Sequence, residues 1–428
     1  MPAQIWAGRP VDRRTAHPHR GLTDQMASKE ALSSVLVVGG GVVGLTTALA
    51  LARAGVPVTV LEAAPELVEE YRASTFHPPT LEMLDDLGLA QGMLAKGLVA
   101  PTFQFRDRRE GLIAEFDLGL LKNDTRFPFR LQLEQHALAV AAYAELLRVP
   151  GATVRFGHEV TGVRLDDDRV VLSVSTAAGP LELSAPYVVG ADGATSAVRR
   201  SLGIAFDGMT YPDRYLVLFT TFDFAKHLDE LSYVNYVSDP EQWFVLLRSP
   251  GVWRVLFPTT AKETDRELEL EEVAQEHLQR VVPTAEPYPI LHRTLYNVHQ
   301  RVAGNYRVGR VLLAGDAAHI NNPLGGMGLN GGIHDAVSLA SALSAVWHGR
   351  ASERVLDEHA VRRRRIAIDY VQAWTHQNAS TLSQTDPGAR KRHQEELRAT
   401  AADPRRARQY LLKTSMIEAL RESRHLEN

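Results

Sequence analysis

The sequence predicts an α/β protein in which a parallel-sheet domain is interleaved with an antiparallel β-sheet domain and followed by C-terminal helices. Ser34 to Leu61 has the strand, glycine turn, helix and strand of a βαβ unit. Tyr215 to Phe257 changes to β-rich runs joined by short polar turns, which is typical of an antiparallel sheet. Val311 to Ala314 returns to a buried strand, and the pattern after Gly332 is helical. The first domain is therefore discontinuous in sequence.

These patterns divide the chain into a leader, two interleaved domains and a helical end. Residues 1–32 are rich in Arg, His and Pro and lack apolar periodicity, so we expect a disordered leader. Met26 is an alternative start, which would make residues 1–25 an extension of the native protein. The expected ranges are 33–110, 131–205 and 300–350 for the first domain, 111–130 and 206–299 for the sheet domain, and 351–428 for the helical region.

Composition excludes several classes of protein. The net charge of -4 over 428 residues gives no broad positive field, so we expect no nucleic-acid or membrane partner. The absence of cysteine excludes disulfides, thiolate-ligated iron-sulfur clusters and thiol catalysis, so a bound organic cofactor has to carry any electrons. We find no His-Glu-x-x-His helix or other metal-ligand spacing, and we expect no metal. Without a hydrophobic signal segment, a cytoplasmic location is expected.

A first glycine motif follows the first predicted strand. Gly39, Gly41 and Gly44 match the GxGxxG spacing between a strand and a helix. In such a turn the first glycine permits the tight bend, the second lets backbone approach a pyrophosphate, and the third lets helix and strand pack closely. Glu62, at the end of the second strand, is placed to bind a ribose hydroxyl. The motif predicts a dinucleotide site but does not distinguish FAD from NAD.

Two further glycine-containing elements follow buried strands. Asp192-Gly193 leads into a helix capped by Thr195 or Ser196, and a capped helix after a turn is the alternative to a ligand role. Gly315-Asp316 is followed by a glycine-dense loop that opens a helix expected from Ile333 to Val346. Backbone N–H groups in such a loop lie against a flat or anionic ligand, although a flexible loop is the alternative.

The three elements, in this order and spacing, resemble the class A flavoprotein monooxygenases, the family of para-hydroxybenzoate hydroxylase and phenol hydroxylase. The resemblance covers about Ser34 to Trp347. It implies a glutathione-reductase-like fold that binds FAD and uses NADH or NADPH and O2. It also implies hydroxylation of a phenolic, aminoaromatic or N-heteroaromatic small molecule through a flavin C4a-hydroperoxide.

The resemblance assigns cofactor roles residue by residue. It places Gly39, Gly41, Gly44 and Glu62 on the ADP half of FAD, Arg72 beside the phosphates, Gln132 against the flavin, Asp192 and Arg199 in an element that serves FAD and nicotinamide, Asp316 on the ribityl chain, and Leu329 and Asn330 against the isoalloxazine. Val43, Ala63, Val160, Gly326 and Gly328 are further expected cofactor contacts, and Pro323 matches the proline that faces the oxygen-reacting edge of the flavin.

Substrate residues are expected on one face of the antiparallel sheet, because the reaction needs a dry, aromatic-lined pocket. The candidates are Tyr215, Tyr233, Asn235, Tyr236 and Trp243, and the strand register decides which of them point inward. His77 and Tyr236 are the candidate base or proton relay. A structural role is the alternative for both, since a lone histidine usually packs or bonds to the chain and most sheet tyrosines are core.

Other activities share parts of this pattern. A flavin-dependent halogenase has the fold, but its Trp-x-Trp-x-Ile-Pro motif is absent here. An oxidase or reductase of the same fold is a further alternative, as is a non-enzymatic scaffold similar to the Rab escort proteins. An NAD dehydrogenase would leave Asp192-Gly193 and Gly315-Asp316 unexplained. Monomer and homodimer both fit the sequence.

Overall fold

The computed structural model describes residues 28–69, 71–259 and 263–425. Most of the expected leader, residues 1–27, lies outside the described residues. Its last part is corrected, because Ser28–Ala31 forms strand β1 and pairs in parallel with β12 (Gly179–Ala185). Glu30 also accepts hydrogen bonds from Arg155 at 2.7 and 2.8 Å. Main-chain pairing and this ion pair fix the segment to the fold.

The first domain is built on a six-stranded sheet that is parallel except for its edge strand. Its order is β19 (Arg307–Val308), β20 (Val311–Leu313), β13 (Val188–Gly190), β2 (Val35–Val38), β3 (Val58–Leu61) and β9 (Ala152–Arg155). Every residue of β2 and β3 is buried, which is typical of parallel strands covered on both faces.

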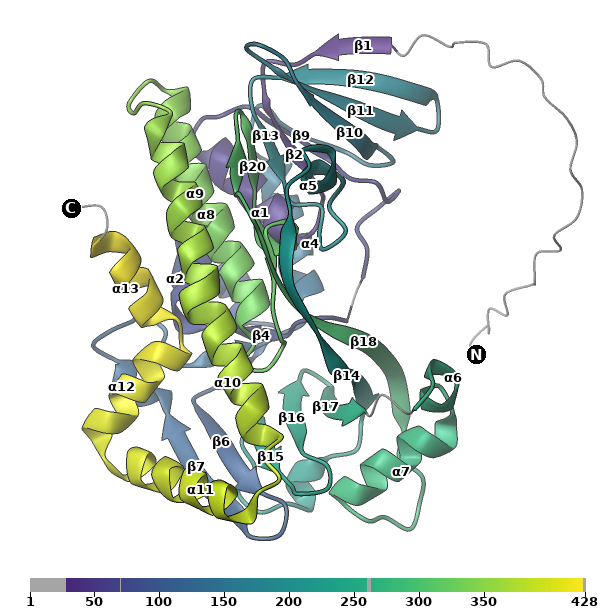
Figure 1. Ribbon diagram of the computed structural model, residues 1–428, viewed down its shortest axis with the longest axis vertical. Helices are drawn as coiled ribbons and strands as arrows, with labels where there is room; N and C mark the ends of the chain where they lie inside the picture. The colour runs from purple at the N-terminus through teal and green to yellow at the C-terminus, as the bar shows by residue number, and fades with distance from the viewer. Residues whose placement is uncertain (1–27, 70, 260–262, 426–428) are drawn as a thin grey trace, which may run out of the picture.

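Different layers cover the two faces of this sheet (Figure 1). Val35 and Val37 pack against helices α1 (Val42–Arg53), α4 (Gln135–Leu146) and α8 (Met327–Trp347). Leu36 and Val38 pack against a four-stranded sheet. That sheet has the order β1, β12, β11 (Val170–Thr176) and β10 (Glu159–Leu165). The carboxyl ends of β2, β3 and β13 therefore meet where the glycine turn starts α1.

The second domain is an eight-stranded sheet. Its order is β21 (His319–Ile320), β18 (Ile290–Ala303), β14 (Phe206–Thr220), β17 (Val252–Thr259), β16 (Phe244–Ser249), β15 (Val234–Ser238), β6 (Thr102–Asp107) and β7 (Gly111–Asp117). The four runs expected between Tyr215 and Phe257 appear as β14 to β17.

The expected boundary at residue 110 is corrected, because β6 and β7 pair as one hairpin. The boundary at 299 is also shifted, because β18 continues to Ala303. Figure 1 shows the long strands β14 and β18 running between the two domains.

Helices cover both faces of the eight-stranded sheet. One face packs against α6 (Asp265–Leu268) and α7 (Glu271–Val281). The other packs against the C-terminal helices α10 (Ala373–Leu382), α11 (Pro387–Ala402), α12 (Pro404–Thr414) and α13 (Ile417–His425), which follow α9 (Arg354–Ile366) and a π-helical turn at Ala367–Gln372. Short elements complete the fold: α2 (Pro78–Asp86), α3 (Ala90–Leu94), α5 (Ala197–Ser201), 3-10 turns at Leu118–Leu121, Phe224–Lys226 and Gly315–Ala317, and a sheet of β4 (Thr75–Phe76), β8 (Arg130–Gln132) and β5 (Leu98–Ala100).

Helix α8 begins six residues earlier than the sequence predicts, at Met327 instead of Ile333. Glycine disfavours helix in isolation, which is why its dense glycines indicated a loop. Tertiary packing overrides that preference: a Cβ at Gly332 would lie 2.7 Å from Val43 Cγ2, so the close contact between α1 and α8 requires a small residue there. The uncapped start of α8 thus lies at Gly326, whose φ of 66° is left-handed.

Candidate functional site

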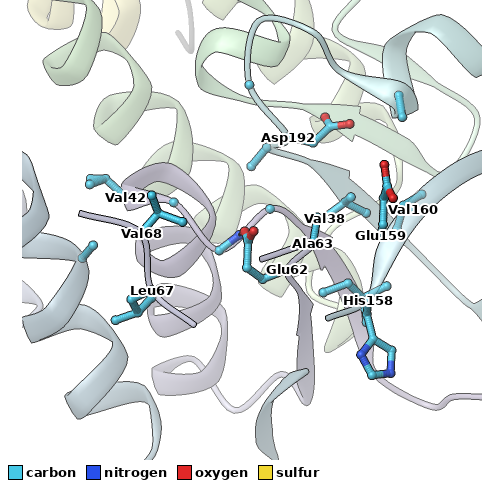
Figure 2. A pocket seen from close by; sticks show the side chains of 18 of the residues that line it. Val38, Val42, Glu62, Ala63, Leu67, Val68, His158, Glu159, Val160 and Asp192 are labelled. Atoms are coloured by element: carbon cyan, nitrogen blue, oxygen red, sulfur yellow. The ribbon is translucent and has the colours of Figure 1, made fainter. Parts of the chain in front are cut away.

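A pocket of about 440 Å³ opens beside the glycine turn. Figure 2 shows Glu62 in its centre, with Leu67 and Val68 on one flank and Val160 and Asp192 on the other. Of the expected cofactor residues, the pocket is lined by Gly39, Gly41, Glu62, Ala63, Val160 and Asp192. Segments from four parts of the sequence therefore meet at one cavity.

The glycines of the turn have different surroundings. Gly39 has a φ of +104°, and a Cβ there would lie 2.4 Å from the carbonyl oxygen of Ala191. A Cβ on Gly44 would lie 1.9 Å from the carbonyl oxygen of Gly39. A Cβ on Gly41 meets nothing within 4 Å. Gly39 and Gly44 are thus required by the protein's own packing, whereas Gly41 leaves open space for a ligand.

The start of α1 fits a phosphate group. The helix has no side-chain cap and no acidic residue in its first turn, and Gly41 and Val42 line the pocket, so the first N–H groups of the helix are left for an anionic ligand. Val43 and Gly44 lie behind this turn: Val43 packs against Gly315 and Gly332. Their role is to hold the turn close to the other glycine elements.

The carboxylate of Glu62 is held in place by main-chain donors. It accepts hydrogen bonds from the N–H of Gly40 at 2.5 Å and of Ala64 at 2.8 Å. A carboxylate has about four lone-pair positions, so acceptor capacity remains for a ribose hydroxyl. The residues present therefore fit the adenosine half of a dinucleotide.

The Asp192 element is both a capped helix start and a wall of the pocket. Ser196, not Thr195, caps α5 by accepting from the N–H of Arg199 at 2.9 Å. Asp192 Oδ2 accepts from the N–H of Val198 at 3.1 Å, and its buried Oδ1 has no partner among the described residues. Asp192 therefore retains a free acceptor atom beside the pocket.

Arg199 joins two glycine elements. Its guanidinium donates to the carbonyl oxygens of Ala317 at 2.8 Å and Ala194 at 2.7 Å, and it lies 3.7 Å from the ring centroid of Phe206. These contacts direct the side chain toward the protein interior, in contrast to the ligand role that the family resemblance implies. Arg200, the next residue, lines the pocket.

A second group of expected residues meets where β4, β8 and the start of α8 converge. Asn330 Nδ2 donates to the carbonyl oxygens of Thr75 at 2.8 Å and Gly326 at 2.6 Å, and its Oδ1 accepts from the N–H of His77 at 2.8 Å. Gln132 Oε1 accepts from Thr75 Oγ1 at 3.0 Å, and its buried Nε2 has no partner in the described chain. We refer to this cluster, Thr75, His77, Gln132, Gly326 and Asn330, as the ring end.

His77 is held as a neutral side chain at the ring end. Its Nε2 lies 2.9 Å from the carbonyl oxygen of Gly325, which only accepts, so Nε2 carries the hydrogen. Nδ1 is then a buried acceptor, and it has no partner among the residues that the structure describes. Burial is the main cause that holds the pKa of His77 well below its usual value, and the nearby positive charge of Arg130 is the second cause. His77 can therefore accept a hydrogen bond but is not a cation at neutral pH.

The remaining expected cofactor residues lie around these two groups. Asp316 is partly buried in the turn Gly315–Ala317, and Arg72 is exposed just before β4. Pro323 belongs to the turn before α8, where its carbonyl oxygen accepts from the N–H of Gly326 at 3.0 Å. Gly328 and Leu329 lie in the first turn of α8 and are partly exposed.

The strand register assigns the candidate substrate residues to different faces. Tyr215, Tyr236 and Trp243 share the face that packs against the C-terminal helices. Asn235 precedes Tyr236 on β15 and points to the opposite face, and Tyr233 is 38% exposed just before that strand. Tyr236 stacks on Phe105 with ring centroids 5.3 Å apart. Asn235 and Tyr233 are therefore not walls of a pocket on the aromatic face.

A buried charge cluster that sequence reasoning missed supports the Gly315 element. Asp335 accepts from Arg363 Nε at 2.5 Å and from the N–H of Gly315 at 3.1 Å, and its Oδ2 lies 2.8 Å from His319 Nε2. It is 1% exposed. Despite burial, the positive charge of Arg363 and the hydrogen bonds from Arg363 and His319 hold its pKa below the usual range. This carboxylate fixes the backbone that precedes Asp316.

Because two buried histidines lie beside this cluster, we predict that the folded protein loses stability in acid. Burial, with Arg363 nearby, lowers the pKa of both His334 and His359 to about 3. Their folded pKa values lie below the unfolded value of about 6.5, so their stabilisation is complete above that pH and is lost as pH falls. Between about pH 6.5 and 3, each histidine steepens the fall of the unfolding free energy by up to about 1.4 kcal/mol per pH unit. The test is urea unfolding of wild type and H359Q at a series of pH values. The unfolding free energy of H359Q should fall less steeply with falling pH, because one of the two histidines is removed. Equal slopes for the two proteins would contradict the assignment.

Searches for other kinds of site gave two findings on the described residues. No helix in ranges 28–69, 71–259 and 263–425 is long and apolar enough to cross a membrane. Within the same ranges, no group of three or more His, Asp or Glu side chains could hold a metal ion.

The fold and the site define a flavoprotein with a dinucleotide-binding domain. The family model described as FAD binding domain matches residues 33–374, and the chain belongs to this family. It is 37% identical over 388 residues to para-nitrophenol 4-monooxygenase of Pseudomonas sp. (strain WBC-3), covering 90% of this chain and 95% of the relative.

Two further comparisons agree. The chain is 35% identical over 362 residues to 6-hydroxy-3-succinoylpyridine 3-monooxygenase of Pseudomonas putida, covering 83% of this chain and 91% of the relative. The crystal structure of p-nitrophenol 4-monooxygenase PnpA from Pseudomonas putida superposes with a TM-score of 0.87 at 36% identity, covering 91% of this chain and 98% of that one. The expected fold and the expected class, an FAD-dependent aromatic monooxygenase that uses NAD(P)H and O2, are confirmed.

Proposed function

We propose that the chain hydroxylates a small hydroxyaromatic compound at the ring carbon opposite its hydroxyl group. The names of both reported relatives place the oxidised carbon there, at position 4 of a phenol and at position 3 of a 6-hydroxypyridine. Ring carbons para to a hydroxyl are electron-rich, and ionisation of the hydroxyl increases this further. A para-substituted phenol such as 4-nitrophenol is therefore the first substrate class to test. There, a C–O bond would form at C4 and the C–N bond would break, so that nitrite leaves with the bonding electron pair and, after loss of a proton, 1,4-benzoquinone remains.

The observation that carries this proposal is the convergence of three glycine elements on one cavity and one ring end. We propose that Gly39, Gly41, Glu62, Ala63, Val160 and Asp192 bind the ADP half of FAD, that Arg72 and Asp316 bind the phosphates and the ribityl chain, and that Gln132, Gly326, Gly328, Leu329 and Asn330 contact the isoalloxazine. The free Nε2 of Gln132 and the free Oδ1 of Asp192 support these roles, because buried polar atoms need partners.

When bound, the flavin accepts a hydride from NAD(P)H and delivers an oxygen atom from O2 to the ring. The protein's own contribution is binding, orientation and exclusion of water. The uncapped start of α8 supplies oriented N–H groups for negative charge at the ring end. We propose that His77 accepts a hydrogen bond at Nδ1, that Pro323 lines the reacting edge, and that Tyr236 is part of the aromatic wall.

We also propose that the enzyme works in the cytoplasm, where reduced nicotinamide cofactors are available, as a monomer or homodimer. The turnover test uses the FAD-loaded protein with NADH or NADPH, and offers 4-nitrophenol, 3-nitrophenol and 6-hydroxynicotinate under 18O2. We expect 4-nitrophenol to be consumed faster than 3-nitrophenol, with one labelled oxygen atom in the ring product. Oxidation of NAD(P)H to NAD(P)+ with reduction of O2 to hydrogen peroxide, and no oxygenated product from any hydroxyaromatic, would refute the proposal.

A further inference from the structure

Arg130 is a buried cation that pairs with no carboxylate of residues 28–69, 71–259 and 263–425. It lies on β8 and is 2% exposed. Its Nε and Nη1 atoms have no hydrogen-bond partner among the described residues. Two other deeply buried arginines are paired with carboxylates, Arg363 with Asp335 at 2.5 Å and Arg254 with Glu134 at 3.4 Å. Arg199 donates instead to the main-chain carbonyl oxygens of Ala317 and Ala194. An unpaired buried charge is costly, so Arg130 is poised for an anion that the folded chain does not supply.

Arg130 lies beside the ring end. It precedes Gln132 by two residues on the same strand, so both side chains leave the same face of the small sheet. Its charge also acts on His77, whose pKa it lowers. A ligand that reaches the Arg130 guanidinium therefore lies next to the residues proposed to contact the flavin ring.

On its other side Arg130 faces a stack of aromatic rings. The guanidinium carbon lies 4.2 Å from the ring centroid of Phe103. Phe103 stacks on Phe116 at 5.3 Å, and Phe116 stacks on Tyr410 of α12 at 4.5 Å. Burial raises the pKa of Tyr410, and the positive charge of Arg130 opposes that rise. The two side chains therefore lie close enough to interact electrostatically. The cation thus lies between the ring end and an aromatic wall.

We propose that Arg130 binds the oxyanion of the aromatic substrate, so that the substrate is recognised in its ionised form. This inference rests on the proposed function. The guanidinium can donate two hydrogen bonds to an oxygen anion, and its neighbour Phe103 provides an aromatic surface beside it. The anion is either a ring phenolate or an acid group carried on the ring, and both have the same charged-oxygen chemistry. Recognition of an ionised phenol would also favour the electron-rich form that the oxygen transfer needs.

Equilibrium binding to the FAD holoenzyme tests this inference, with the flavin absorbance as the signal. The probes are 4-nitrophenol above and below its pKa, 4-nitroaniline as a neutral analogue, and 4-aminobenzoate as a carboxylate without a phenolate. We expect R130M to weaken binding of 4-nitrophenolate at least about tenfold and that of 4-nitroaniline less than about threefold. R130K should retain part of the affinity. A larger loss for 4-aminobenzoate than for 4-nitrophenolate would identify the acid group as the recognised anion.

The matched control is R248M. Arg248 also lies over an aromatic ring, 5.2 Å from the Trp253 centroid, but it is on β16 of the eight-stranded sheet and not on the small sheet that carries Arg130. The R248M variant should leave the affinity for all three probes unchanged.

Because no described carboxylate pairs with Arg130, the melting temperature of substrate-free R130M should equal or exceed that of wild type. The inference is overturned if R130M binds 4-nitrophenolate as wild type does, if it loses all probes equally with a lower melting temperature, or if wild type binds no oxyanion probe. Wild-type turnover of 4-nitrophenol separates these outcomes from failure of the proposed function.

Discussion

Replacing Gly41 with alanine is expected to weaken FAD binding at least about tenfold, which corresponds to about 1.4 kcal/mol, without changing the stability of the apoprotein. The added methyl group meets no protein atom within 4 Å, so the fold loses nothing. It occupies the space beside the uncapped start of α1, where a pyrophosphate would approach the backbone. Titration of apoprotein with FAD, followed by fluorescence quenching, measures the affinity, and thermal unfolding measures the stability.

Gly44 is the matched control within the same turn. G44A adds the same methyl group, but its Cβ would lie 1.9 Å from the carbonyl oxygen of Gly39. The backbone has to move, so we expect G44A to lower the melting temperature of the apoprotein, whereas G41A leaves it unchanged. Wild-type affinity for FAD in G41A would contradict the placement of the cofactor at this pocket.

Replacing Asp335 with asparagine is expected to destabilise the protein by about 3 to 5 kcal/mol, because it leaves the buried charge of Arg363 unpaired. The variant also loses an acceptor that holds the N–H of Gly315, so FAD retention should fall with stability. The stabilisation from the lowered pKa of Asp335 is present above the unfolded value of about 3.9 and is lost as pH falls through the folded value. Urea unfolding at neutral pH measures the difference.

The control for this prediction is D369N, which breaks an exposed pair. Asp369 lies 3.1 Å from Arg365, with side chains 54% and 64% exposed. Exposed pairs of this kind contribute about 0.3 to 0.5 kcal/mol, so D369N should unfold almost as wild type does. Equal effects of D335N and D369N would show that the buried cluster has no special role in holding the Gly315 element.

The parts of the site that depend on local backbone chemistry could be predicted from the sequence. Gly39, Gly41 and Gly44 act within one short turn, and Glu62 follows the next strand, so their spacing alone indicates the pocket. Alternation of apolar residues likewise predicted strands β14 to β17. Gln132 and Asn330 needed the family resemblance, whereas His77 was a candidate base or proton relay for the implied reaction. The structure brings these three residues together at the ring end.

The rest depends on contacts between distant segments. Asp335 and Arg363 are separated by 28 residues, and their pairing follows from how α8 and α9 pack. Arg130 becomes unusual only because no carboxylate in the described part of the chain pairs with it after folding, and Tyr410 meets Phe116 because α12 returns to the sheet. The separation of Tyr236 from Asn235 required a strand register, since a shift of one residue exchanges the two faces.

The central claim is that the three glycine elements of this chain bind one FAD. Its most direct test is the flavin released when the purified protein is denatured, quantified against protein concentration and identified by mass. We predict FAD at a ratio approaching one per chain, or restoration of that ratio when FAD is added to the apoprotein. A colourless protein that binds no added FAD would contradict the account.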